Sequence, residues 1–471
     1  MDATTPFWTA FVEHVEKEPQ RPALTCTGVT LSRRELHDRA LALAHQLKDQ
    51  GVTQGSFVSV VLPNCPEFVI GCLAAWALGA VPQPLSGKLP PLELTAILEL
   101  TQPAAVVDET TSFPPAGDHA PLPEAVSPSW KAPTSGGSSG RPKVIVAGTP
   151  AVFGVAEGFG GLLGIDGQSP LLTTAPLSHN GPFMMCNLNL ILGGHSVLMP
   201  RFDAQEALRL IEEHRVGWVY AVPTMMSRMW KLEGREQYDV SSVKTLMHMA
   251  APCPPQLKAD FIEWFGADVV MELYAGTEAQ AATIISGREW LAHRGSVGKV
   301  ALGDMEIRDD EGNPVPVGTV GKVWLRMPEG QSTYRYLGAT AESDGTGWES
   351  LGDLGRFDED GYLYLADRES DMILVGGSNV YPAEIEAALL EHPDVDDACV
   401  VGLPDEDKGS VPHAIVRFRG DARPDLAPFL KERLAAYKLP KTFEVVDEQL
   451  RDAAGKVRRA QLRAERLPAT P

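Results

Sequence analysis

The chain has 471 residues and a formal net charge of −21. This length exceeds what one hydrophobic core usually holds, so two or more domains are expected, and the negative charge disfavours nucleic acid and anionic membranes as partners. No apolar run approaches the length of a transmembrane helix, and the N-terminus lacks the basic and apolar regions of a signal peptide. The six cysteines are scattered, which predicts reduced thiols in a cytoplasmic protein rather than a zinc site or a disulfide framework.

Strand and helix patterns alternate up to about residue 295. Residues 31–50 carry apolar side chains at helical spacing, and residues 57–62 form a short β-branched run followed by a buried helical pattern. Further apolar strands are expected at AAVVDE, SVLMP, GWVYAVP and ADVVMELY, with a helix at 204–215 and a Pro-, Ala- and Ser-rich loop at 112–133. The alternation predicts an α/β fold of layered, largely parallel sheets.

From residue 295 onward the pattern changes to short strands separated by glycine-rich turns. This predicts a β-rich subdomain at 295–369 that closes a large N-terminal domain of residues 1–369. The order strand, turn, helix, strand after Arg368 predicts a small α+β domain at 370–471, with the boundary near Ser370.

The strongest local motif is SGGSSGRPK at residues 135–143, followed by a strand pattern. Glycines allow a loop to wrap closely around phosphate oxygens, while hydroxyls, backbone N–H groups and a lysine donate to them. The motif is not a Walker loop, because Arg141 and Pro142 separate Gly140 from Lys143. A flexible Gly/Ser linker is the alternative, and the strand that follows disfavours it.

SGGSSGRPK resembles the phosphate loop of the adenylate-forming superfamily, which includes acyl-CoA synthetases, peptide-synthetase adenylation domains and luciferases. Four more segments match that family in its order: YAGTE at 274–278, WESLGDLGR at 348–356 with Asp367 and Arg368, the segment 371–386, and GKVRR at 455–459. The resemblance covers nearly the whole chain. It is closest to bacterial acyl-CoA ligases for bulky polycyclic acids, such as bile-acid- or terpenoid-like acids.

The resemblance implies ATP, Mg²⁺ and coenzyme A as co-substrates, and a C-terminal lid that rotates between two half-reactions. It implies that Glu278 binds Mg²⁺, that Lys456 bridges the substrate carboxylate and the ATP phosphate, and that Thr277 contacts phosphate. The implied ATP- and AMP-binding residues are Thr134, Ser135, Gly137, Ser138, Ser139, Gly140 and Lys143 at the phosphates, Ala250, Ala251, Pro252 and Tyr274 at adenine, and Asp353 and Arg368 at the ribose. Gly376 and Gly377 are implied to line the coenzyme A tunnel, and Ser370 to form the hinge.

Without the family, each of these residues has a simpler interpretation. Glu278 would be a solvated loop residue and Asp353 a turn residue. Lys456 would belong to a solvated basic helix face.

Three positions depart from the family pattern: Gly136 in the phosphate loop, Ala275 beside the adenylate, and Ser370 at the hinge. If the backbone at 275 needs positive φ, alanine costs about 1 kcal/mol there. These departures leave open an enzyme specialised for forming the thioester from a pre-formed adenylate.

The segment 176–183 resembles the family's acyl-pocket lining. The implied pocket residues are His179, Asn180, Phe183, Met184, Met225 and Gly276. Because methionine fills irregular apolar space, a cluster of methionines predicts a bulky hydrophobic acid, with a methionine-rich core as the alternative. The cluster consists of Met184, Met185, Met225, Met226, Met229, Met247 and Met249.

The sequence therefore predicts a ligase that joins a small-molecule carboxylic acid to coenzyme A, with a homodimer among the expected assemblies. An enzyme that loads a carrier protein, a luciferase-like oxygenase and an inactive nucleotide sensor are the alternatives. The acyl-pocket segment offers no acidic partner for an ammonium group, which argues against amino-acid substrates.

Overall fold

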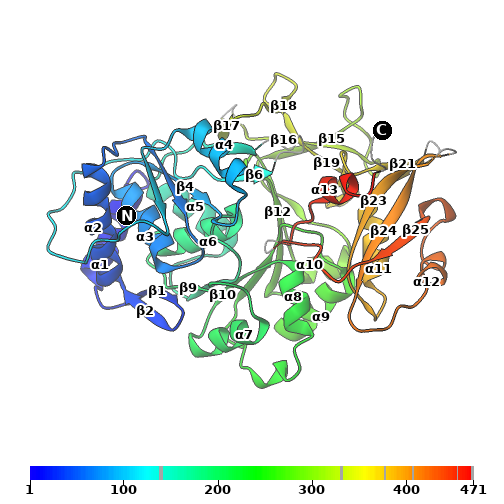
Figure 1. The fold of residues 1–471 in the computed structure, drawn as a ribbon, viewed down its shortest axis with the longest axis horizontal. Helices are drawn as coiled ribbons and strands as arrows, with labels where there is room; N and C mark the ends of the chain where they lie inside the picture. The colour runs from blue at the N-terminus through cyan, green and yellow to red at the C-terminus, as the bar shows by residue number, and fades with distance from the viewer. Residues whose placement is uncertain (137–141, 329–331, 376–377, 406–407, 453–454, 468–471) are drawn as a thin grey trace.

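The computed structural model describes residues 1–136, 142–328, 332–375, 378–405, 408–452 and 455–467. A large domain occupies the left and centre of Figure 1, and a smaller C-terminal domain, coloured orange to red, lies at the right. Helices cover sheets in the large domain, so the predicted α/β architecture is confirmed. None of the helices in the described ranges is long and apolar enough to cross a membrane.

A nine-stranded sheet with the order β14-β13-β12-β11-β10-β8-β9-β1-β2 forms the centre of the large domain. Its middle strands, from β12 to β1, are parallel, and antiparallel strands complete both edges. The strands are β1 (Pro22–Cys26), β2 (Val29–Ser32), β8 (Leu171–Thr173), β9 (Ser196–Leu198), β10 (Trp218–Ala221), β11 (Thr245–His248), β12 (Val270–Ala275), β13 (Ala282–Ser286) and β14 (Lys299–Leu302).

Two three-stranded sheets accompany the central sheet. The sheet β4-β3-β5 is parallel, whereas β17-β7-β6 is antiparallel. The strands are β3 (Phe57–Val61), β4 (Val81–Leu85), β5 (Ala105–Asp108), β6 (Thr134–Gly136), β7 (Pro142–Ala147) and β17 (Tyr334–Leu337).

The helices of the large domain pack on these sheets. Helix α2 begins with a capping box in which Ser32 and Glu35 satisfy each other's backbone N–H groups, and α3 is buried along nearly its whole length. The helices are α1 (Phe7–Lys17), α2 (Arg33–Asp49), α3 (Pro66–Ala77), α4 (Pro91–Thr101), α5 (Phe153–Leu163), α6 (Asn180–Ile191), α7 (Ala204–Glu213), α8 (Pro223–Trp230), α9 (Pro255–Phe265) and α10 (Gly287–Ala292).

Most strands of the β-rich region expected at 295–369 form a five-stranded antiparallel sheet. Two further strands of the region, β14 and β17, join other sheets. Strand β14 belongs to the nine-stranded sheet and β17 pairs with β7. The region is therefore built into the large domain by long-range pairing. Its own strands are β15 (Asp304–Arg308), β16 (Gly321–Arg326), β18 (Glu342–Ser343), β19 (Glu349–Phe357) and β20 (Leu363–Arg368).

The C-terminal domain contains one five-stranded sheet with its own apolar cores. Ser370 lies in the turn between β20, the last strand of the large domain, and β21, the first strand of the C-terminal sheet. The domain boundary near residue 370 stays a prediction that agrees with this position. The elements are β21 (Ile373–Val375), β22 (Ser378–Val380), β23 (Val395–Asp405), β24 (Gly409–Phe418), β25 (Thr442–Val445), α11 (Pro382–Leu390), α12 (Ala427–Lys431) and α13 (Arg459–Ala464).

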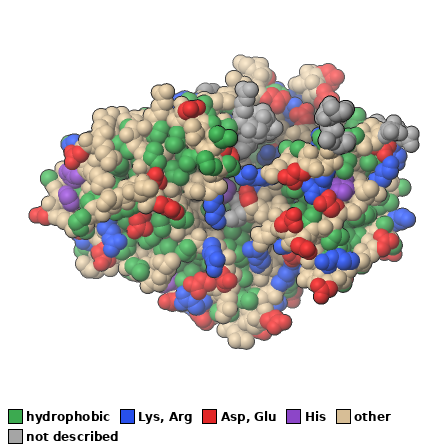
Figure 2. Space-filling model, in the orientation of Figure 1, with side chains coloured by type: hydrophobic (Ala, Val, Ile, Leu, Met, Phe, Trp, Pro, Cys, Tyr) green, Lys and Arg blue, Asp and Glu red, His purple; other side chains and the backbone are tan. Residues whose placement is uncertain are grey.

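Acidic and basic side chains are interspersed over much of the face shown in Figure 2. With a net charge of −21 over the whole chain, an anionic ligand has to be held by locally placed donors.

Candidate active site

The predicted site residues gather at the carboxyl ends of the parallel strands. His179 follows β8, Ala250 follows β11, and Tyr274 stands near the end of β12. Ligands of open parallel sheets bind at this edge, because the connecting loops converge there.

The predicted phosphate loop is flanked by a hairpin. Thr134 pairs with Val144, and Ser135 pairs with Lys143, across β6 and β7. This pairing places Lys143 beside Ser135. Of the predicted phosphate contacts, Gly137, Ser138, Ser139 and Gly140 lie outside the described residues.

Lys143, Glu278 and Tyr336 form one polar network. Lys143 Nζ lies 3.2 Å from Glu278 Oε1 and donates to Tyr336 Oη at 2.9 Å. Tyr336 donates to the same Glu278 oxygen at 2.5 Å. Glu278 is only 5% exposed, so it is not a solvated loop residue. A buried carboxylate suits Mg²⁺, which prefers oxygen ligands, so Glu278 fits this ion.

Gly276 and its neighbours explain how Glu278 is positioned. A Cβ at Gly276 would lie 2.3 Å from Leu351 Cδ1 and 3.0 Å from Glu278 Oε2, so any larger residue here would displace the Leu351 side chain and crowd the Glu278 carboxylate. Thr277, which lies between Gly276 and Glu278 in the chain, is half-buried. The condition for strain at Ala275 is not met, because this residue has no positive φ and pairs with Ala282 in the sheet.

The predicted ribose residues meet across two sheets. Tyr274 donates to Asp353 Oδ2 at 2.7 Å, and Arg368 Nε lies 3.3 Å from Asp353 Oδ1. Asp353 and Arg368 are paired neighbours on β19 and β20. Burial, reinforced by Asp353, raises the pKa of Tyr274 well above its ordinary value. Asp353 is thus presented as a hydrogen-bond acceptor, as a ribose diol requires.

The predicted adenine turn, residues 250–252, carries backbone strain. Ala250 has φ +74°, a left-handed conformation that costs an alanine about 1–2 kcal/mol. Behind the turn, Lys258 of α9 forms a buried ion pair with Glu272 of β12. This pair was not predicted from the sequence, and it ties α9 to the strand that carries Tyr274.

Lys456 reaches this site from the C-terminal domain. Its backbone N–H donates to Asp452 Oδ1 at 3.0 Å, and the Asp452 N–H donates to the Lys456 carbonyl at 2.9 Å. Gly455, at φ +77°, packs against Val222 and Thr224 at the start of α8. The C-terminal domain therefore contacts the large domain at Gly455, the residue before Lys456.

The electrostatics of Lys456 connect it to the other site residues. Desolvation in this crowded region and the charge of Arg368 lower the pKa of the Lys456 ammonium, whereas Asp452 and Glu278 oppose that change. Its charge also acts on His179, whose pKa is lowered first by burial and then by Lys456, against the opposing charge of Asp452. The Lys456 side chain is exposed to solvent, and its charge is coupled both to Glu278 and to His179.

Models of two protein families match the chain. The AMP-binding enzyme model matches residues 11–131 and 132–335, and the model of the AMP-binding enzyme C-terminal domain matches residues 384–456. The chain belongs to the AMP-binding enzyme family. It is an AMP-forming enzyme of the acid–CoA ligase type.

Individual relatives of this family member span nearly the whole chain. It is 31% identical to a feruloyl-CoA synthase of Amycolatopsis sp, over 96% of this chain and 97% of that protein. It is 30% identical to the fatty acid–[acyl-carrier-protein] ligase ScoC of Streptomyces coeruleorubidus, over 96% and 94%.

Among solved structures, the o-succinylbenzoate CoA synthetase of Bacillus subtilis with its acyl-adenylate intermediate matches with a TM-score of 0.84 and 27% identity, over 97% of this chain and 98% of that chain. A second structure of that synthetase contains ATP and a magnesium ion. The relatives are named for different acids, so family membership does not specify the acid of this AMP-binding enzyme.

The segment before the predicted acyl pocket is held by a buried asparagine. Asn64 donates to the carbonyls of Ala175 and Met199 at 2.9 and 2.8 Å and accepts from the Leu177 N–H at 2.7 Å. His179 and Asn180 follow, half-buried, at the start of α6. Asn64 therefore positions these two side chains, and it was missed because its partners are distant in the sequence.

The predicted acyl residues do not all lie together. Phe183 is fully buried in the core, where its ring contacts Trp76 and Trp130. Met226 and Met229 belong to a separate core, and Met184 packs with the first core. The cluster beneath the acyl segment contains Met185, Met225, Met247 and Met249, together with Tyr220.

Lys131 is a candidate site residue that the sequence analysis missed. It is 3% exposed, and its amine donates to Asn180 Oδ1 and lies 3.3 Å from Met184 Sδ. The available signal was a lysine next to a tryptophan, Trp130, at the end of the Pro-, Ala- and Ser-rich stretch before the phosphate motif.

Of the residues predicted for the hinge and the coenzyme A tunnel, the structure describes only the hinge residue, Ser370. Ser370 is exposed next to Asp371, with Oγ 3.4 Å from its Oδ1. Gly376 and Gly377 lie outside the described residues.

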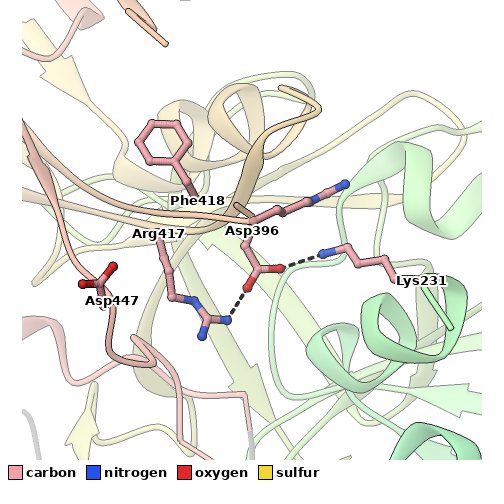
Figure 3. Close-up of a pocket in the computed structure, with 6 residues that line it drawn as sticks. Lys231, Asp396, Arg417, Phe418 and Asp447 are labelled. Carbon is pink, nitrogen blue, oxygen red and sulfur yellow. Dashed lines mark hydrogen bonds and ion pairs between the residues drawn. The ribbon is translucent and has the colours of Figure 1, made fainter. Parts of the chain in front are cut away.

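A second contact joins the domains at the far end of α8. Lys231, which caps α8, lies 2.9 Å from Asp396 of β23, and Arg417 of β24 contacts the other oxygen of Asp396. Figure 3 shows these side chains lining a cavity of about 380 Å³. Because α8 is about 12 Å long, the C-terminal domain contacts the large domain at two separated points, Gly455 and Asp396.

Proposed function

We propose that this enzyme activates a bulky, hydrophobic, ring-bearing carboxylic acid with ATP to an acyl-adenylate, and then transfers the acyl group to coenzyme A. The observation that carries this proposal is the buried Lys143–Glu278 network, with the chain next to Lys456 packed on the start of α8 at Gly455. A carboxylate and the α-phosphate of ATP repel each other, so placing an ammonium between them lowers the barrier to their reaction.

The roles of the surrounding residues follow from their contacts. Lys143 and the phosphate hairpin would neutralise the leaving pyrophosphate, and Asp353 with Arg368 would hold the ribose. Tyr274 and the turn at 250–252 would enclose adenine. Glu278 would hold Mg²⁺, which supplies Lewis-acid stabilisation of the phosphate charge. Thr277, half-buried beside Glu278, would donate to the α-phosphate.

We infer the class of acid from the side chains that pack next to the predicted acyl segment. Met225, Met247 and Met249 pack with Tyr220, and Tyr220 and Met249 lie against Gly181, the residue after Asn180. Flexible thioethers adapt to bulky, irregular ligands. The feruloyl- and o-succinylbenzoate-specific relatives act on ring-bearing acids by their names. A steroid- or terpenoid-like acid is the specific class that we propose.

The test is a screen of aromatic, steroid and terpenoid acids for coenzyme A thioesters by mass spectrometry, with ATP and Mg²⁺. Lys456→Ala should lower acid-dependent exchange of pyrophosphate into ATP by about 100- to 1,000-fold. It should leave thioester formation from a supplied acyl-adenylate largely intact. Lys431→Ala, at an exposed lysine of α12 in the same domain, is the matched control. Undiminished exchange in the Lys456 variant would exclude the proposed role.

Loading of a carrier protein is the second candidate, because ScoC is similar over nearly the whole chain. The two functions differ in the acceptor thiol. Turnover with free coenzyme A supports the first proposal, whereas acylation of a phosphopantetheinyl carrier protein with no turnover on coenzyme A supports the second.

A further inference from the structure

Lys131 is a buried lysine with no acidic partner in contact. Its side chain lies 3% exposed, with Nζ 4.7 Å from the centre of the Trp130 ring. The amine donates to the amide oxygen of Asn180 and contacts the thioether of Met184. Among the ion pairs of the described residues, none includes Lys131, so its charge is met only by neutral groups and a ring face.

This arrangement is unfavourable without a ligand. An ammonium removed from water costs several kcal/mol unless an anion compensates for it. Burial accordingly lowers the pKa of Lys131 to about 7, and the more distant charge of Glu278 only partly opposes this. A methionine or leucine would fill the same space without that cost. Such costly groups gather at functional sites, where a ligand completes them.

The position of Lys131 indicates which part of the substrate it meets. Asn180 and Met184, the two side chains on its amine, both belong to α6, the predicted acyl-pocket helix. The phosphate hairpin begins three residues later, at Thr134, and three residues of extended chain span about 10 Å. Lys143 and Lys456 already serve the phosphate end. Lys131 therefore faces the acyl end of the site.

We propose that Lys131 is a specificity-determining residue of the acyl pocket, and that its amine binds a second anionic group, a carboxylate, carried by the acyl substrate. This inference rests on the proposed ligase function and narrows its acid to one bearing a second acid group. The Asn180 amide accepts from Lys131 through Oδ1 and can direct its N–H donors at the same carboxylate. Because the protein carries a net charge of −21, an anionic acyl group needs such a local cation.

The experiment compares matched acids that differ only in the second carboxylate. One pair is 3-(4-carboxyphenyl)propanoate and 3-(4-methylphenyl)propanoate, and alkyl and larger ring-bearing pairs extend the range of lengths. Coenzyme A thioester formation gives kcat/KM for each acid with the wild type, Lys131→Met and Lys88→Met. Lys88 is an exposed lysine between β4 and α4, so its variant is the control for loss of one positive charge.

The wild type should prefer the dicarboxylic member of at least one pair by about 10-fold or more. Lys131→Met should lower kcat/KM for that diacid by about 100-fold, mainly through KM, because it leaves a carboxylate unpaired. The same variant should keep or improve turnover of the methyl analogue. Lys88→Met should leave kcat/KM unchanged for both the diacid and the methyl analogue.

Two results would overturn the inference. One is a wild type that forms thioesters yet prefers the methyl member of every pair, a measurement that needs no variant. The other is a Lys131→Met enzyme whose activity falls equally on both members while its KM for ATP rises, which would assign the amine to the nucleotide. Failure of the wild type to form a thioester or adenylate with any acid would instead refute the proposed function, and the inference with it.

Discussion

Replacing Lys131 by methionine should stabilise the ligand-free protein at neutral pH. Methionine has a similar length and no charge to desolvate, whereas the buried Lys131 amine has its pKa lowered from 10.5 to about 7. Between these two pH values the unfolded chain binds a proton that the folded protein does not, so the stability of the wild type rises with pH across this window. Below about pH 7 both states are protonated and the penalty is constant.

The structure sets the magnitude. The difference between 10.5 and about 7 corresponds to a penalty of about 4–5 kcal/mol at pH 7, which falls by about 2 kcal/mol at pH 9. Removing this penalty stabilises the variant, but the variant also loses the hydrogen bond from Lys131 to Asn180, which costs it about 1–2 kcal/mol. The variant should therefore be about 2–4 kcal/mol more stable than the wild type at pH 7, and its advantage should shrink by about 2 kcal/mol at pH 9.

Urea unfolding at pH 7 and pH 9, followed by tryptophan fluorescence, measures both values, and Trp130 lies directly beside the substitution. Lys88→Met should match the wild type at both pH values. A Lys131→Met protein that is less stable than the wild type at pH 7, or whose advantage does not change with pH, would refute the reasoning that this amine is desolvated and unpaired.

Three further substitutions test the docked lid and the adenine turn. Lys231→Met removes the contact with Asp396, which is worth about 0.5–1 kcal/mol, so pyrophosphate exchange should fall about 2- to 5-fold while thioester formation from supplied adenylate does not. Glu272→Gln leaves Lys258 buried without its anion and should destabilise the large domain by about 3 kcal/mol in urea unfolding. Ala250→Gly should relieve the positive φ and stabilise the protein by about 1 kcal/mol in the same assay.

Each of these has a discriminating outcome. Lys244→Met is the control for the lost charge of Lys231, because Lys244 contacts Ser169 within the large domain. An equal loss of both half-reactions in the Lys231→Met variant would argue that the contact with Asp396 does not act on adenylation alone. An unchanged unfolding midpoint for the Glu272 variant would show that Lys258 is not buried as described. Destabilisation by glycine at 250 would contradict the strained backbone.

The ligand-binding chemistry of this protein was predictable from its sequence where it lies in consecutive residues. The glycine-rich run before Lys143, the YAGTE segment with Glu278, and the GKVRR segment with Lys456 each combine residue types that phosphate chemistry requires. The alternation of strands and helices likewise predicted the α/β architecture, because side-chain periodicity is a local property.

Only the tertiary structure decided which of these residues meet and what supports them. Tyr336 reaches Glu278 because β17 pairs with β7 across almost 200 positions of the chain, and no local pattern encodes such pairing. The same holds for Asn64 beneath the His179 segment. Burial also reversed the simpler interpretation of Glu278, which is enclosed, and it placed the predicted pocket residue Phe183 in the core. Lys131 drew no attention as one lysine among many, and only its removal from water, with no anion beside it, gives it a distinct chemistry.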